Sequence, residues 1–301
     1  MRYVFVVNPK AGAGTAEQTV REAVNALPEK DLCEIYVTKG LKDATVFVKG
    51  WCEEHPDEEV RFIACGGDGT ISEVVNGLVG YPKASFTCYP CGSGNDFVKT
   101  FGAEKFLDIP ALIHAEEQPL DLLKVGDRYS NNVVNFGFDT TVALTVNESR
   151  DKKGTSSKSA YTKGIVKALV TSMKNKFLVK ADGEVINPKG KALLCTVANG
   201  QYVGGSFKCA PRAKTDDGLI EVCLVDCISR ITFVQLIGLY TRGEHLDDPK
   251  MKKILVYRQA KKVEVEAPEG FAYSLDGEII YEDHFTIEIV PAAVKVAVPA
   301  N

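Results

Sequence analysis

One stretch of the chain, residues 60–78, restricts the possible folds more than any other. Val60 to Cys65 is a short apolar run, typical of a buried parallel strand, and from Thr70 onward apolar residues recur at helical spacing. Three glycines lie between these runs: Gly66, Gly67 and Gly69. Glycine accepts positive φ and lets a ligand approach the backbone, so such a turn can direct several N–H groups at a phosphate near a helix start. The stretch therefore predicts a strand, a phosphate-binding turn and a helix.

Asp68 stands among those glycines, and its carboxylate would repel a bare phosphate. The repulsion disappears if a divalent cation joins the two groups, so the turn favours a nucleotide carried with Mg²⁺. On this stretch alone, a tight strand-to-helix connection without a ligand stays open as the alternative.

A second turn of the same kind follows about twenty residues later. Ala84 to Tyr89 reads as another buried strand, and it runs into the segment Pro90 to Phe97, after which a helical pattern starts. Loops at the carboxyl ends of parallel strands lie at the same edge of a sheet, so the two turns are expected to converge on one ligand.

Together these turns resemble the catalytic domain of the diacylglycerol and sphingosine lipid kinases, and the soluble bacterial diacylglycerol kinases most of all. The segments that carry the resemblance are Gly66–Thr70, Glu73–Gly77 and Pro90–Phe97. The resemblance implies an ATP-dependent lipid kinase that transfers the γ-phosphate to a lipid hydroxyl with Mg²⁺, and diacylglycerol, giving phosphatidic acid, is the first choice of acceptor. Ser93 stands where the family usually has threonine, and Ala11 where serine is frequent; Ser93 keeps the hydroxyl.

The resemblance also implies the site residues. The ATP contacts would be Asn8, Pro9, Lys10, Ala11, Gly12, Thr38, Gly66, Gly67, Asp68, Gly69, Thr70, Ser93, Asn95, Asp96 and Glu278. Asp276, in an Asp-Gly-Glu turn, would be the catalytic base. Asp68, Asp96 and Asp121 would organise Mg²⁺, and a structural Mg²⁺ would bind the Asp217 side chain with the carbonyls of Lys214 and Leu219. Hairpin turns at Asp217 and Asp276, and an exposed strand carboxylate at Asp121, are the structural alternatives.

Strand and helix patterns alternate over residues 1–118, which predicts a parallel sheet covered on both faces. Glycine-punctuated strands dominate from residue 119 onward, with Asn131 to Asp139 as one strand and Ile231 to Tyr240 as the one clear helix. We therefore predict an α/β nucleotide-binding domain similar to NAD kinase over 1–118. A β-rich, sandwich-like lipid-substrate domain would cover 119–301, and the resemblance implies an active site in the cleft between them.

Residues 150–191 concentrate positive charge, with eleven Lys or Arg against three acidic residues. An apolar helical stripe crosses this segment: Ile165, Val166, Leu169, Val170 and Met173. Such a segment suits peripheral contact with an anionic membrane surface, and a solvated helix with its core side inward is the alternative. Sparse aromatic residues disfavour nucleic acid as a partner. No apolar run approaches 18 residues, and the sequence starts without a signal-peptide pattern, so we expect a cytoplasmic, peripherally membrane-associated protein.

Other functions share part of this pattern. NAD kinases have the same Gly-Gly-Asp-Gly-Thr turn, so a soluble kinase of that kind is the nearest rival. Sphingoid bases, monoacylglycerol and other lipid alcohols stay open as acceptors. A non-catalytic lipid-binding regulator that keeps only the fold is a third alternative, and a homodimer is one option for the oligomeric state.

Overall fold

The structure is a computed structural model that describes residues 1–150 and 157–300, without the side chains of residues 149, 150, 157 and 158. The chain divides into two compact units, Met1–Leu122 with Val290–Asn301, and Leu123–Ile289. The second unit therefore ends earlier than the sequence predicted. The reason is β18 (His284–Val298), which pairs with β15 (Lys262–Glu266) through its first half and with β4 (Ala84–Pro90) at Val296.

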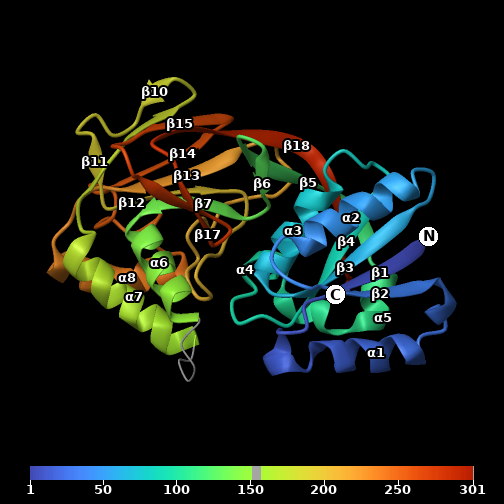
Figure 1. The fold of residues 1–301 in the computed structure, drawn as a ribbon. Helices are drawn as coiled ribbons and strands as arrows, with labels where there is room; N and C mark the ends of the chain where they lie inside the picture. The colour runs from blue at the N-terminus through green and yellow to red at the C-terminus, as the bar shows by residue number, and fades with distance from the viewer. Residues whose placement is uncertain (151–156, 301) are drawn as a thin grey trace. The chain divides into compact units, whose positions relative to one another are not determined.

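The first unit is a parallel sheet with helices on both faces, as predicted (Figure 1). Its strands follow the order β2-β1-β3-β4, and β18 joins parallel to β4. The new strands are β1 (Arg2–Val7), β2 (Cys33–Val37) and β3 (Val60–Gly66). The helices are α1 (Ala16–Ala26), α2 (Asp43–Glu54), α3 (Asp68–Leu78), α4 (Asp96–Lys99) and α5 (Ile109–Ile113). Every residue of β3 is buried, which explains why the strand is apolar apart from Arg61, whose guanidinium donates to the carbonyls of Leu112 and Ile113.

Helices α2 and α3 pack unusually closely, and the segment after the glycine turn explains why. A Cβ at Gly77 would lie 2.8 Å from the Cβ of Val48, so only glycine fits at this crossing. The Glu73 carboxylate accepts hydrogen bonds from the backbone N–H groups of Lys42 and Ala44, at 2.9 and 3.2 Å. Glu73 thus satisfies N–H groups at the start of α2 that have no partner within the helix.

The second unit is a β-sandwich with helices on one outer face (Figure 1). One layer is an antiparallel sheet in the order β14-β13-β12-β7-β16-β17, and β15, β9, β10 and the first half of β18 form the other. The six strands of the first layer are β7 (Val133–Gly137), β12 (Leu194–Ala198), β13 (Ile220–Val225), β14 (Leu255–Ala260), β16 (Ala272–Leu275) and β17 (Glu278–Tyr281). The remaining strands are β5 (Glu116–Val125), β6 (Arg128–Ser130), β8 (Asn175–Lys176), β9 (Leu178–Ala181), β10 (Glu184–Val185) and β11 (Lys191–Ala192).

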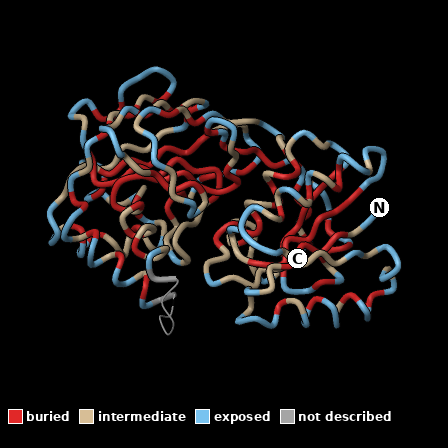
Figure 2. Tube along the Cα trace, viewed as in Figure 1, coloured by how far each residue is buried: buried red, intermediate tan, exposed pale blue. Residues whose placement is uncertain are grey.

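Aromatic side chains fill the space between the two layers. Phe136 makes edge contacts with Phe177, Phe271 and Phe285, and Tyr273 stacks on Phe285 at 4.1 Å between ring centroids. In Figure 2 the buried residues follow the strands of each unit, while the covering helices alternate between buried and exposed positions. The sandwich-like second domain predicted from the sequence is confirmed.

Two details of the second unit differ from the prediction. The strand predicted over Asn131 to Asp139 ends at Gly137, and α6 (Phe138–Arg150) begins at the next residue. Gly137 has φ of +94°, and a Cβ there would lie 2.6 Å from the Leu193 carbonyl oxygen, so the chain turns where only glycine fits. The second difference is the number of helices. The sequence predicted one clear helix in this unit, which is α8 (Arg230–Arg242), but α6 and α7 (Ser157–Thr171) are also present. Over the described residues, we find no helix with the length and hydropathy that a membrane span needs.

Candidate functional site

In the first unit, the two glycine turns predicted to converge are in direct backbone contact. The Cys91 N–H donates to the Gly66 carbonyl at 2.8 Å, and a Cβ on Gly92 would overlap the Cα of Gly67. A Cβ on Gly66 would overlap the Thr70 side chain in the first turn of α3. Glycine is therefore required here for close approach, and the contact brings the turn before α3 and the turn before α4 to one edge of the sheet.

The turn after β1 joins the same edge. Gly12 donates its N–H to the Cys91 carbonyl at 2.9 Å, and the Asn8 side-chain amide lies 3.4 Å from the Thr70 hydroxyl. The Asn8 carboxamide oxygen accepts from the Lys10 N–H, which closes the Asn-Pro turn. Three loops from β1, β3 and β4 are thus bonded to each other, and they contain most of the predicted ATP contacts.

Two predicted contacts have less defined surroundings. Thr38 follows β2 directly and donates its N–H to the Val7 carbonyl, so it lies at the carboxyl edge of the sheet. Ser93 is exposed in the second glycine turn. Asn95 holds that turn in shape, because its side chain bonds both the N–H and the carbonyl of Gly92 while its own φ is +52°.

Two carboxylates meet beside Gly94. A Cβ there would lie 2.8 Å from Asp68 Oδ2 and 3.7 Å from Asp96 Oδ2, which places both groups around one point. Burial, and then the charge of Asp96, raise the pKa of Asp68, while hydrogen bonds from the Phe97 and Asp96 N–H groups and the Lys99 charge act in the opposite direction. Lys99 Nζ forms an ion pair with Asp96 at 2.8 Å. A buried pair of like charges is an arrangement that a bound cation stabilises.

The residues present fit Mg²⁺ held partly by a nucleotide. Among the described residues, no group of three or more His, Cys, Asp or Glu side chains could hold a metal ion. Mg²⁺ bound with a nucleotide commonly uses one or two carboxylates and takes its other oxygens from phosphates and water. The pair Asp68 and Asp96 supplies that number.

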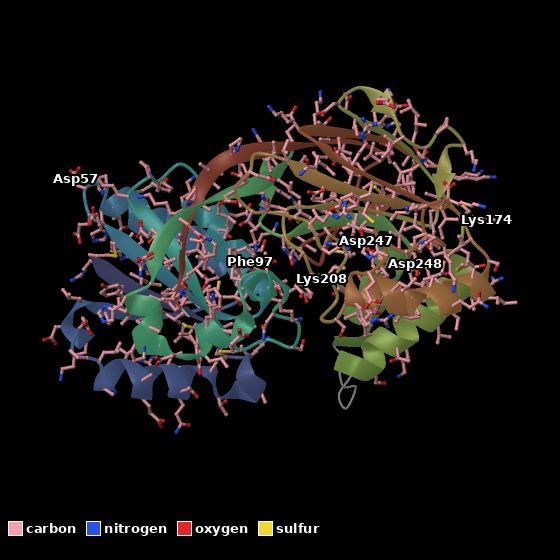
Figure 3. All side chains as sticks on the ribbon, turned by 180° about the vertical axis from the view of Figure 1, so that it is seen from behind. Asp57, Phe97, Lys174, Lys208, Asp247 and Asp248 are labelled. Atoms are coloured by element: carbon pink, nitrogen blue, oxygen red, sulfur yellow. The ribbon has the colours of Figure 1, made fainter. Side chains whose placement is uncertain are left out.

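Phe97 anchors the element that carries Asp96. Its ring, labelled in Figure 3, is fully buried and packs against Phe86 and Phe101 at centroid distances of 5.9 and 5.3 Å. Its N–H donates to Asp68 Oδ1 at 3.2 Å. The apolar ring therefore fixes the position of one carboxylate, and its backbone orients the other.

Asp121 is buried in β5 rather than exposed, which differs from the structural alternative considered above. Its Oδ1 accepts from the Ala292 N–H at 2.7 Å, and Ala292 has φ of +48°. The carboxylate thus supports an irregular backbone point in β18, and this contact could not be foreseen from local sequence.

In the second unit, Asp276 occupies a two-residue hairpin between β16 and β17. Asp276 and Gly277 have φ of +48° and +89°, as in the tight hairpins that favour Asp-Gly. The Asp276 carboxylate accepts three hydrogen bonds, from the Ser130 hydroxyl at 2.7 Å and from the N–H groups of Asn131 and Val133 at 3.1 and 2.9 Å. These donors hold the carboxylate in one orientation.

The same unit contains a comparable turn at Asp182 and Gly183, between β9 and β10. Their φ values are +49° and +82°, and the Asp182 carboxylate accepts from the N–H groups of Lys261 and Lys262. An Asp-Gly hairpin with a bonded carboxylate is therefore not in itself a catalytic feature. Asp276 differs because a side-chain hydroxyl also bonds it and because it is half-buried, whereas Asp182 is exposed.

The remaining predicted residues lie near the surface of the second unit. Glu278 pairs with Arg128 at 2.9 Å, with about half of its side chain exposed. Asp217 is exposed and accepts from the Leu219 N–H at 3.1 Å, which is the local turn expected for an Asp-Gly sequence, and Lys214 is exposed three residues before it. Ser130, Asn131 and Val133 were not predicted, because they reach Asp276 across more than 140 positions of sequence.

Two protein families match the chain, one for each part of the fold. The YegS C-terminal NAD kinase beta sandwich-like domain matches residues 132–298, and the Diacylglycerol kinase catalytic domain matches residues 2–125. The chain belongs to this family of lipid kinases. The resemblance inferred from the glycine turns is confirmed.

Some relatives of this lipid kinase are named as YegS-like lipid kinases and others as diacylglycerol kinases. A protein named "Probable lipid kinase YegS-like" from Serratia proteamaculans is 28% identical, over 99% of this chain and 94% of its own length. A "Diacylglycerol kinase" from Bacillus subtilis is 29% identical, over 72% of this chain and 70% of its own length. A crystal structure of a diacylglycerol kinase from Bacillus anthracis superposes with a TM-score of 0.71 and 22% identity, covering 99% of this chain and 96% of that one, which shows the shared fold.

Membership of a kinase family makes this lipid kinase a phosphotransferase and implies the use of ATP. The relatives' names do not agree on one acceptor.

Proposed function

We propose that this lipid kinase transfers the γ-phosphate of ATP to the hydroxyl of a lipid, with diacylglycerol as the first choice and phosphatidic acid as its product. The observation that carries the proposal is Asp276, a half-buried carboxylate that three donors orient at a glycine turn. Unlike the exposed carboxylate of Asp182, it is half-buried and is also bonded by a side-chain hydroxyl. Gly277 beside it has no side chain and is exposed, which leaves room for an acceptor hydroxyl.

The nucleotide would lie on the three bonded loops of the first unit. The contact set is that predicted from the sequence: Asn8 to Gly12 and Gly66 to Thr70, with Thr38, Ser93, Asn95 and Asp96. The start of α3 offers N–H groups for a phosphate, and the glycines let that phosphate approach the backbone. Glu278, paired with Arg128, is proposed as a further nucleotide contact.

Asp276 would act as the general base. The hydroxyl oxygen of the acceptor attacks the γ-phosphorus, the bond from that phosphorus to the bridging oxygen of ADP breaks, and the carboxylate takes the hydroxyl proton. The three donors that hold Asp276 fix the direction of its carboxylate before the acceptor arrives.

Mg²⁺ would be held by Asp68 and Asp96 together with phosphate oxygens. When bound, it would neutralise charge on the transferred phosphoryl group. Asp121 is proposed as a third member of this network, although its Oδ1 already accepts from Ala292. The structural Mg²⁺ proposed for Asp217, Lys214 and Leu219 would have to replace the hydrogen bond between Asp217 and Leu219.

The test is transfer of labelled γ-phosphate from Mg²⁺-ATP to a panel of acceptors in mixed micelles. The panel contains diacylglycerol, monoacylglycerol, sphingosine and NAD. Label in diacylglycerol above the other acceptors is the expected result. Label in another lipid would change the acceptor and keep the reaction, whereas label in NAD alone, or in none of them, would overturn the proposal.

A further inference from the structure

The apolar stripe predicted in the basic segment does not all face the core. In α7, Ile165 and Leu169 pack against the cluster that includes Val142 and Phe233, and Met173 beyond the helix is buried in it. The side chains of Val166 and Val170 point the other way, with 57% and 67% of their surface exposed. The part of the basic segment that lies within 151–156 is outside the described residues.

The orientation of α7 is fixed by its close contact with α6. A Cβ at Gly164 would lie 3.0 Å from the Val142 carbonyl oxygen, so the two helices approach as closely as glycine allows. Lys167 adds an ion pair to Glu148 of α6 at 3.3 Å. The exposed valines therefore belong to a firmly packed helix and cannot simply rotate inward.

The start of α8 extends this apolar surface. Ile231 and Val234 are 74% and 65% exposed. Arg230 ties them to the end of α7, because its guanidinium donates to the carbonyls of Leu169 and Val170 at 2.6 and 3.1 Å. Both helices lie on the same side of the sandwich in Figure 1. Four of the exposed large aliphatic side chains of the described chain thus gather on two joined helices.

The charge around these four side chains is positive. Neither helix contains an aspartate or a glutamate; Lys163 is exposed in α7 and Lys174 is exposed three residues after its end. Lys174 projects outward from its unit in Figure 3. Lys174, Lys189 and Lys191 all act on Cys227, two residues before Ser229 at the start of α8, so further cations surround this end. The nearby acids Glu148 and Asp226 are paired with Lys167 and Lys189.

We propose that this docking face binds the surface of an anionic lipid bilayer. Its members are Lys163, Val166, Val170, Lys174, Arg230, Ile231 and Val234. Aliphatic side chains would enter the boundary between headgroups and acyl chains, while lysines would meet lipid phosphates. Exposed aliphatic side chains with cations around them are unfavourable in water and favourable at an anionic bilayer surface. An acidic protein groove would account for the cations but not for the four aliphatic side chains.

The docking face is also close to the turn proposed to act on the acceptor. Asn147, near the end of α6, donates its side-chain N–H to the Gly277 carbonyl at 3.3 Å. Since α7 packs on α6, only one helix separates the docking face from the turn that holds Asp276. Docking would thus bring a membrane lipid near that turn. The catalytic benefit of docking rests on the proposed function of Asp276.

Vesicle sedimentation tests the docking face without requiring catalysis. The full chain is mixed with vesicles of phosphatidylcholine alone or of phosphatidylcholine with phosphatidylglycerol. We expect binding to the anionic vesicles only. The double change Ile231→Ser with Val234→Ser should weaken it about tenfold by loss of apolar burial. Lys163→Gln with Lys174→Gln should weaken it about twentyfold, since each lysine near an anionic surface contributes about fivefold.

Matched controls come from α2, where Val46 is 70% exposed and Lys49 is also exposed. Val46→Ser and Lys49→Gln should leave vesicle binding unchanged. Equal binding to neutral and anionic vesicles, or equal losses in the α2 controls, would overturn the docking face.

Phosphoryl transfer to an acceptor in detergent micelles separates the two proposals. The docking variants should keep this transfer. Absence of transfer in the wild-type chain would refute only the kinase reaction.

Discussion

Asp139 is the second residue of α6, and it places a carboxylate in a poorly solvated part of the second unit. Its Oδ2 is sealed from solvent and has no hydrogen-bond partner among the described residues. Burial raises the pKa of this carboxyl from 3.8 to about 7, and its charge in turn helps to raise the pKa of the Cys195 thiol. No role in catalysis or binding is needed to predict what this group does to stability.

The sign and size follow from proton linkage. A carboxyl whose pKa is higher in the folded chain binds its proton more tightly there, so the free energy of unfolding falls as pH rises from about 4 to about 7. Each pH unit in that window lowers the free energy of unfolding by about 1.4 kcal/mol. The loss is about 4 kcal/mol over the whole window and about 2.5 kcal/mol from pH 5 to pH 7. Above pH 7 the loss is complete.

The perturbation is Asp139→Asn, which keeps the shape and removes the charge. Urea unfolding followed by circular dichroism at pH 5 and pH 8 measures the free energy of unfolding of wild type, Asp139→Asn and the control Asp127→Asn, an exposed aspartate in the turn between β5 and β6. The wild type and the control should lose about 2.5 kcal/mol more than Asp139→Asn between the two pH values. Equal losses in all three proteins would refute the account of Asp139.

Two further predictions concern the nucleotide loops. Gly92→Ala should lower the free energy of unfolding by about 1–3 kcal/mol, because its Cβ would overlap the backbone of Gly67; Gly50→Ala, with nothing within 4 Å, should not lower it, and equal effects in urea unfolding would refute the close contact. Asp68→Asn should weaken ATP binding in the presence of Mg²⁺ by about tenfold and strengthen binding in its absence, because the carboxylate no longer repels the bare phosphates; calorimetry measures both, and an unaltered Mg²⁺ dependence would count against a metal site there.

Local patterns were sufficient to predict the sheet of the first unit and the contact between its glycine turns. The residues of β3 other than Arg61 are apolar because the strand is buried on both faces, and such a pattern is visible in one sequence. Gly66 and Gly92 are visible in the sequence as turn glycines, and the structure shows that a Cβ at either position would overlap a neighbour.

Features that depend on distant partners could not be predicted in this way. Phe138 at the start of α6 follows Phe136 of β7 at strand spacing, so the sequence does not mark the boundary that the positive φ of Gly137 sets in the structure. The return of β18 to the first unit, the bond from Asp121 to Ala292 and the three donors to Asp276 all join positions more than 140 residues apart. The stripe of α7 was ambiguous for a related reason: which of its aliphatics are buried is decided by packing on α6.

The central claim is that Asp276 takes the proton of a lipid hydroxyl during transfer from ATP. Its most direct test compares wild type, Asp276→Asn and Asp182→Asn, since Asp182 occupies the same kind of hairpin with a bonded carboxylate. With Mg²⁺-ATP and diacylglycerol in mixed micelles, Asp276→Asn should reduce turnover by about a hundredfold or more while ATP binding is retained, and Asp182→Asn should leave turnover near the wild-type value. Turnover that survives in Asp276→Asn, or that falls equally in both variants, would contradict the assignment of Asp276 as the base.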